Sequence, residues 1–157
     1  RLRAEESDLT EEPRLIRLEA QPALVAGAEA DPACLAETSA GLHARVIEFA
    51  LRSGSPSSGA PFTRYLGCTE SGRLRIEAGV PTLDPLPGGD GVESVMLEGG
   101  EAVALSYEGD DSELPALHAA LDDWMETHGR RPAAPRVESY LAGPLHRHVL
   151  IYQVVEE

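Results

Sequence analysis

Residues 135–143 read Pro-Arg-Val-Glu-Ser-Tyr-Leu-Ala-Gly, a short run with the alternation of a β-strand. Because side chains alternate along a strand, Val137 and Leu141 are predicted to face one side while Glu138 and Tyr140 face the other. A carboxylate two residues from a phenol on a concave sheet face suits an organic cation, to which the acid offers charge and the ring a π-face. A half-exposed strand with a solvated glutamate fits the same pattern, so the rest of the chain must decide.

An earlier stretch, residues 61–67, reads Pro-Phe-Thr-Arg-Tyr-Leu-Gly and echoes the first one. When Tyr65 is aligned with Tyr140, Thr63 stands opposite Glu138, so the counterpart of the acid is a neutral hydroxyl. Around both stretches the chain has the same order of elements: strand, helix ended by glycine, strand, turn, strand. This order predicts an internal duplication, with a site between the halves that is asymmetric in charge.

Two amphipathic helices are predicted, one in each half. The first begins at Asp31-Pro32, an N-cap acid followed by proline at the first helical position, and runs to about Arg52. The second is capped by Ser112 and stops at Gly129. The fold class predicted is therefore α+β: duplicated strand-helix-strand-strand modules that form a mainly antiparallel sheet, with two helices on one face and a ligand groove on the other.

A length of 157 residues fits one domain. Residues 1–12 are predicted to be a linker or the end of an upstream helix, and residues 13–157 to be the domain itself. The two pseudo-repeats are placed at about 14–81 and 92–155, and the Pro- and Gly-rich residues 81–91 join them. Since the chain begins with Arg1 rather than Met, we expect it to be either a fragment of a longer protein or a processed chain.

The net negative charge of the chain favours some classes of binding partner over others. Thirteen basic and 27 acidic residues give a net charge of −14, which repels phosphate backbones and favours cationic partners. We therefore expect no direct contact of this domain with nucleic acid. Nothing resembles a signal peptide, a membrane span or a cofactor motif, and Cys34 and Cys68 lack redox or metal spacing, so a cytoplasmic domain without cofactor is expected.

The histidines are the remaining residues of chemical interest. His146 and His148 lie on one face of a predicted strand, but a closed metal site needs further ligands and no companion cluster is evident, so no metal is predicted. His118 and His128 lie on the second predicted helix, where we expect them to be solvated or packed.

In order and spacing, several short motifs together resemble the GyrI-like effector-binding domain, a fold of two strand-helix-strand-strand modules. That family includes stand-alone proteins and the C-terminal ligand domains of MerR- and AraC-type transcription regulators. The motifs that carry the resemblance are Pro61-Phe62-Thr63-Arg64-Tyr65, Glu77-Ala78-Gly79-Val80-Pro81, Leu105-Ser106-Tyr107-Glu108-Gly109, Leu121-Asp122-Asp123-Trp124 through Gly129, and Glu138-Ser139-Tyr140-Leu141.

The resemblance implies that Glu138 sits at the floor of an aromatic cleft and meets lipophilic cations. Trp124 is included as a candidate although we expect it to belong to the core. Many family members carry an acid two positions before the tyrosine of the final strand, where this chain has Leu150, so a less acidic pocket is implied. The ligand-binding candidates are Glu138, Tyr140, Tyr65, Tyr107, Tyr152, Thr63 and Trp124.

Three functions stay open at this point. Arg1 to Glu6 resembles the link after the dimerising helix of MerR-type regulators, which implies a sensor domain in a homodimer that binds DNA through another part of the protein. A stand-alone member would instead be a small hydrolase that uses Glu138 with a tyrosine, Tyr65 being the candidate. The third alternative is a protein-interaction module like the gyrase inhibitor.

Overall fold

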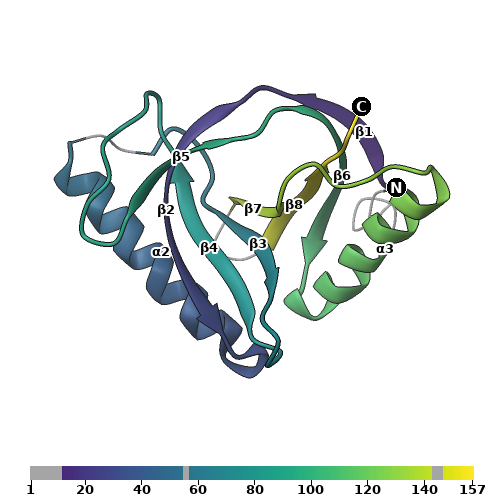
Figure 1. Cartoon of the computed structure of the whole chain (residues 1–157), viewed down its shortest axis with the longest axis horizontal. Coiled ribbons are helices and arrows are strands. Elements are labelled where there is room, and N and C mark those ends of the chain that lie inside the picture. Colours follow the sequence, from purple (N-terminus) through teal and green to yellow (C-terminus); the bar gives the residue numbers. More distant parts are fainter. Residues whose placement is uncertain (1–11, 55–56, 143–146) are drawn as a thin grey trace. The chain divides into compact units, whose positions relative to one another are not determined.

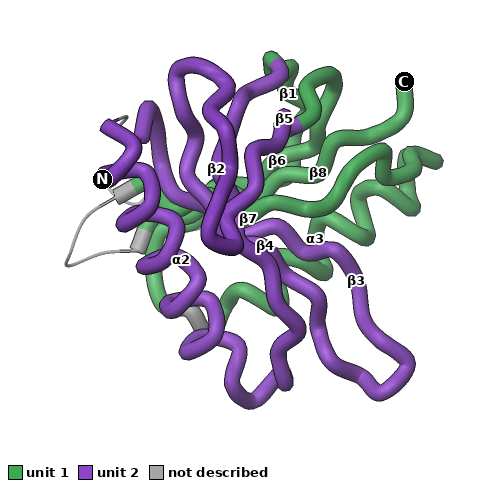
Figure 2. The backbone as a smooth tube through the Cα atoms, turned by 60° about the vertical axis from the view of Figure 1, so that its left-hand side comes forward, with its two compact units in different colours: residues 1–19, 98–157 green, residues 20–97 purple. Residues whose placement is uncertain are grey.

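The computed structural model describes residues 12–54, 57–142 and 147–157. Two compact units divide the chain, one made of residues 1–19 and 98–157 and the other of residues 20–97 (Figure 2). Most of the predicted linker at residues 1–12, and also His146, lie outside the described ranges.

The unit of residues 20–97 is a four-stranded antiparallel sheet with one long helix. Along the sheet the strands follow the order β3, β4, β2, β5. The helix packs on β2 and β4 (Figure 1). The elements are β2 (Gln21–Ala30), a 3-10 turn (Pro32–Cys34), α2 (Leu35–Arg52), β3 (Phe62–Cys68), β4 (Leu74–Pro81) and β5 (Glu93–Leu97).

Local sequence signals fix the start of the 3-10 turn that leads into α2 and the end of α2 itself. The side chain of Asp31 accepts a hydrogen bond of 3.1 Å from the backbone N–H of Ala33, and Pro32 follows it. At the other end Gly54 has a φ of 74°, a left-handed conformation that glycine adopts without strain. The predicted helix start at Asp31-Pro32 and the predicted end at Arg52 are both confirmed.

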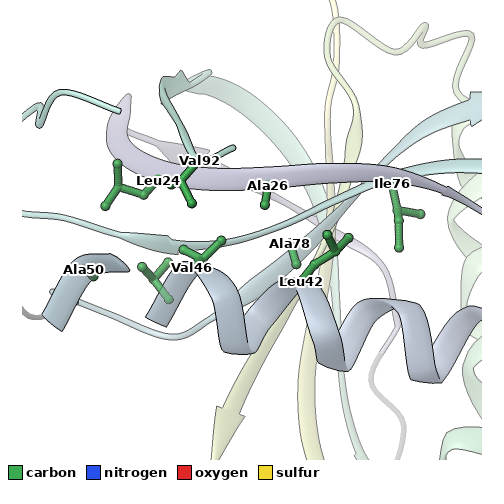
Figure 3. Packing of buried hydrophobic residues seen from close by; sticks show 9 residues of the cluster. Leu24, Ala26, Leu42, Val46, Ala50, Ile76, Ala78 and Val92 are labelled. Atoms are coloured by element: carbon green, nitrogen blue, oxygen red, sulfur yellow. The ribbon is translucent and has the colours of Figure 1, made fainter. Parts of the chain in front are cut away.

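The core of this unit forms where α2 meets the sheet. Leu42, Val46 and Ala50 recur at helical spacing, so they lie on one face of α2 and point toward the strands (Figure 3). Gly79 allows close packing on the other face, since an added Cβ would lie 2.7 Å from the ring of Phe62. The buried core residues are Leu24, Ala26, Leu42, Val46, Ala50, Ile76, Ala78, Val80 and Val92.

The second unit has the same kind of architecture. Its strand order is β1, β6, β8, β7, all antiparallel, with α3 packed on β6 and β8. Its elements are β1 (Arg14–Leu18), β6 (Gly100–Gly109), a 3-10 turn (Asp111–Glu113), α3 (Leu114–Thr127), β7 (Arg136–Ala142) and β8 (Arg147–Val154). Its buried core residues are Val103, Leu105, Tyr107, Leu117, Leu121, Met125, Val149, Ile151 and Val155.

The two units repeat one another in sequence order, as β2-α2-β3-β4 and β6-α3-β7-β8. Helix α2 has 18 residues and α3 has 14, so they differ by four residues or about one turn. Both helices end before a glycine with positive φ, 74° at Gly54 and 64° at Gly129. The predicted α+β class, with two helices and antiparallel strands, is confirmed for the described residues.

Residues 14–30 form two strands that belong to different units. β1 pairs with β6, whereas β2 begins at Gln21 and pairs with β4 and β5. Each unit therefore takes one strand from the other half of the sequence. Local patterning does not show such an exchange, because pairing partners are distant in sequence.

Candidate ligand-binding site

Glu138 is a buried acid on the face of its sheet that α3 covers. Only 3% of the residue is exposed. In the register of the strands it lies beside Ile151, which in turn lies beside Leu105, and both of these belong to the core under α3. The acid was expected on the face opposite the helices. The structure places it on the helix side, because the alternation of β7 puts residue 138 in the same row as that core.

Hydrogen bonds engage both oxygens of the carboxylate. The hydroxyl of Tyr140 donates to Oε1 at 2.9 Å. The Nε2 atom of His118, on α3, lies 2.6 Å from Oε2. Because an ionised carboxylate can only accept, both neighbours act as donors toward it, and charge-assisted bonds of this kind are the stronger ones. The two donors therefore stabilise a negative charge on Glu138, a side chain that is almost completely shielded from solvent.

A partly buried arginine holds His118 in turn. Arg136, at the start of β7, donates through Nη1 to the backbone carbonyl of His118 at 3.2 Å and lies 3.5 Å from its Nδ1. Its Nη2 donates to Asp122 at 2.6 Å. Since a guanidinium has no acceptor, Nδ1 of His118 faces a donor, which favours the tautomer with the proton on Nε2. That proton points at Glu138.

Two of the predicted aromatic residues share the face of Glu138. Tyr107 on β6 and Tyr140 on β7 both lie beside Val149 of β8 and form the next row of the sheet. Tyr107 is 7% exposed, and its hydroxyl accepts a 3.2 Å hydrogen bond from the backbone of Asp110. Trp124 packs against the same core and stacks on His128 with ring centroids 4.0 Å apart.

Tyr152 is not brought to this cluster. It follows Ile151 on β8, so strand alternation turns it to the opposite face, where its cross-strand neighbours are Ala104 and Val137. The grouping of Tyr152 with Glu138 is therefore corrected. Tyr152 directly follows Ile151, the neighbour of Glu138, so its side chain lies on the other face of the sheet from Glu138.

The remaining candidates, Thr63 and Tyr65, belong to the unit of residues 20–97. Thr63 is 1% exposed and lies 3.4 Å from both Nε2 of His43 and Oγ of Ser39, two residues of α2. Tyr65 packs against the core under α2. In both units a helix histidine precedes its strand partner by 20 residues, as His43 precedes Thr63 and His118 precedes Glu138. One unit thus carries a neutral version of the cluster and the other an acidic version.

The burial of His43 predicts a pH dependence of stability. Burial lowers the pKa of His43 from its ordinary value of 6.5. The unfolded chain then takes up a proton more readily than the folded protein, so acid favours unfolding. We expect the free energy of unfolding to be constant above about pH 7.5 and to fall as the pH drops through the unfolded pKa of about 6.5 toward the folded one.

Urea unfolding at pH 7.5 and pH 5.5 measures this effect. His43→Gln keeps a nitrogen donor near Thr63 but cannot take up a proton, so its loss of stability between the two pH values should be smaller than that of the parent. Equal losses in the two proteins would show that His43 does not contribute.

Sequence reasoning overlooked His118 as part of the site. It was expected to be solvated or packed, but it contacts the acid directly. The available signal was its place on α3 next to buried Leu117 and its spacing of 20 residues before Glu138, which repeats that of His43 before Thr63. Arg136 was part of the quoted strand but had been given no role.

Metal binding and insertion into a membrane are two further possibilities for the described part of the chain. Within it, no group of three or more His, Cys, Asp or Glu residues is placed to hold a metal ion, and Nε2 of His148 lies 2.9 Å from Oγ of Ser106. No helix in residues 12–54, 57–142 or 147–157 is long and apolar enough to span a bilayer.

A family model for the GyrI-like small molecule binding domain matches residues 11–152. The chain belongs to the GyrI-like family of small-molecule-binding domains. The match covers every element described above except the end of β8. Among curated proteins, none matches the sequence of this GyrI-like domain.

Solved structures share the fold at low sequence identity. One chain of a cryo-EM structure of the EcmrR-DNA complex has a TM-score of 0.81 and 16% identity, over 98% of this chain and 60% of that one. The structure of SAV2435 bound to tetraphenylphosphonium has a TM-score of 0.64 and 13% identity, over 92% and 94% of the two chains. A hydrolase from Listeria innocua has a TM-score of 0.63 and 15% identity, over 98% and 96%. The GyrI-like domain thus spans 60% of the length of the EcmrR chain it matches.

Proposed function

We propose that this GyrI-like domain is the small-molecule sensor of a transcription regulator and that it binds lipophilic cations at Glu138. The observation that carries the proposal is a carboxylate that is 3% exposed, accepts hydrogen bonds at both oxygens and lies in a row next to Tyr107 and Tyr140. A fixed negative charge beside aromatic rings attracts an organic cation both by charge and by its ring faces.

Two structural neighbours support the two parts of the proposal. The chain from a complex with DNA supports the regulator part, and the structure with a bound phosphonium supports the binding of a lipophilic cation. With a net charge of −14, this domain would not contact DNA itself, so the DNA-binding part would lie elsewhere in a cytoplasmic homodimeric regulator. The ligand-binding residues proposed are Glu138, Tyr140 and Tyr107, with Tyr65, Thr63 and Trp124 as further candidates.

A pair of ligands that differ mainly in charge tests the proposal. We expect methyltriphenylphosphonium to bind about tenfold more tightly than its neutral analogue triphenylphosphine oxide, since only the cation gains from the carboxylate. Isothermal titration calorimetry of the purified chain measures both affinities. Equal affinities would contradict a cation site.

A hydrolase is the second candidate function. The bond from the Tyr140 hydroxyl to Glu138 and the structural likeness to the Listeria innocua hydrolase favour it. In that role Glu138 would be a general base and the tyrosine would be Tyr140 rather than Tyr65, because Tyr140 is the one that touches the acid. Turnover of an activated ester that is lost in Glu138→Gln would select the hydrolase over the sensor.

A further inference from the structure

The hydrogen bonds of Glu138 restrict which cation it can accept. An ionised carboxylate has about four lone-pair sites. The internal bonds from Tyr140 and His118 use one site on each oxygen, at 2.9 Å and 2.6 Å. The side chain of Glu138 is only 4% exposed, so there is little room for water to complete the bonds of an incoming ligand. Glu138 can therefore attract a cationic ligand by its charge more readily than it can accept hydrogen bonds from that ligand.

Cations differ in how many acceptors they need. A primary ammonium carries three N–H donors, and each one that is buried without an acceptor costs free energy. A quaternary ammonium or a phosphonium carries a full positive charge and no donor. In a site whose carboxylate already accepts hydrogen bonds, a quaternary ammonium or a phosphonium avoids the cost of burying an N–H donor without an acceptor.

His118 is one of the residues that already occupy an acceptor of Glu138. Its Nε2 makes the shorter of these bonds to Glu138. Arg136, which also donates to Asp122, contacts His118 from the other side. We infer that His118 is a specificity-determining residue of the site, one that occupies an acceptor of Glu138 and so selects cations without N–H donors over primary ammonium ions. The inference rests on the proposed function, because it concerns the choice among cations at the same acid.

A matched pair of cations tests the inference. 1-Adamantylammonium and trimethyl(1-adamantyl)ammonium share one hydrophobic cage and one charge but differ in their N–H donors. The ratio of their dissociation constants is measured by calorimetry for the parent chain, His118→Leu and His118→Gln. Comparing the ratio between proteins cancels the extra hydrophobic surface of the methyl groups.

His118→Leu frees one acceptor of Glu138, so the primary ammonium should gain relative to the quaternary ion. We expect the ratio to shift by about tenfold toward the primary ammonium, the scale of one charge-assisted hydrogen bond. His118→Gln places an amide N–H near the former position of Nε2 and should keep the ratio of the parent. A histidine with a purely structural role would weaken both ligands equally and leave the ratio unchanged in His118→Leu, which would overturn the inference.

A measurement on the parent protein does not depend on the folding of a variant. With ¹⁵N-labelled histidine, the Nε2–H signal of His118 should remain hydrogen-bonded when the site is saturated with the quaternary ion. Loss of that bond on binding would overturn the inference while leaving the cation site intact. If the parent chain bound neither adamantyl cation, the proposed function itself would fail, and the inference with it.

Discussion

Replacing Arg64 by methionine should lower the free energy of unfolding by about 3–5 kcal/mol, the usual cost of leaving one member of a buried ion pair without its partner. Arg64 on β3 lies beside Glu77 on β4, and its Nε and Nη2 both donate to one carboxylate oxygen, at 2.9 Å and 2.6 Å. The two side chains are 10% and 13% exposed. Without the guanidinium, the charge of Glu77 would be largely shielded from water and poorly compensated.

The double variant Arg64→Met/Glu77→Leu is the matched control. It removes both charges and keeps a similar volume, so most of the lost stability should return, because a buried pair is often no better than apolar packing. In the other unit the corresponding pair of positions carries no charge, since Ser139 on β7 and Leu150 on β8 are neighbours there. Urea unfolding of the parent, the single variant and the double variant measures the effect. A single variant as stable as the parent would contradict this account of the pair.

Glu138→Gln should weaken the binding of a lipophilic cation by about 1.5–3 kcal/mol, or roughly 10- to 150-fold, the scale of a contact with a charged group. The amide keeps the shape of the acid. Its oxygen can still accept from His118, and its nitrogen can donate to the hydroxyl of Tyr140, so the domain should stay folded. Fluorescence titration with a cationic dye measures the loss. If the variant bound such dyes as well as the parent, the acid would be structural.

Tyr140→Phe serves as the control for the hydroxyl. It removes the 2.9 Å bond to Glu138 but keeps the ring face. We therefore expect it to cost about 1 kcal/mol or less of cation binding, less than the loss of the charge itself. A loss as large as that of Glu138→Gln would mean that the hydroxyl, and not the charge, governs binding.

Local rules in the sequence predicted the helices and part of the site. The cap at Asp31 and the glycines after α2 and α3 have simple physical roles, and the structure confirms that both helices exist. The predicted cap at Ser112 is wrong, because the side chain of Asp110 accepts from the backbone N–H of Ser112 and α3 begins at Leu114. Alternation correctly placed Glu138 and Tyr140 on the same face of β7. The same alternation places Tyr152 on the opposite face from Ile151, the neighbour of Glu138, and so removes Tyr152 from the candidates.

Long-range pairing could not be predicted in the same way. β5 and β6 follow one another in sequence, but β5 pairs with β2 whereas β6 pairs with β1 and β8. The role of His118 was hidden for a related reason. Whether a histidine at the border of a helix face meets solvent or an acid depends on which strand the helix covers, and that strand lies 20 residues away.

The charge of Glu138 and the charge of the ligand can be varied together, and the coupling between them tests the proposed cation site most directly. The affinities of methyltriphenylphosphonium and triphenylphosphine oxide are measured for the parent chain and for Glu138→Gln, which completes a double-mutant cycle. We predict a coupling free energy of about 1.5–3 kcal/mol, with the neutral ligand nearly indifferent to the substitution. A coupling free energy of zero, with both ligands weakened equally or not at all, would contradict the cation site.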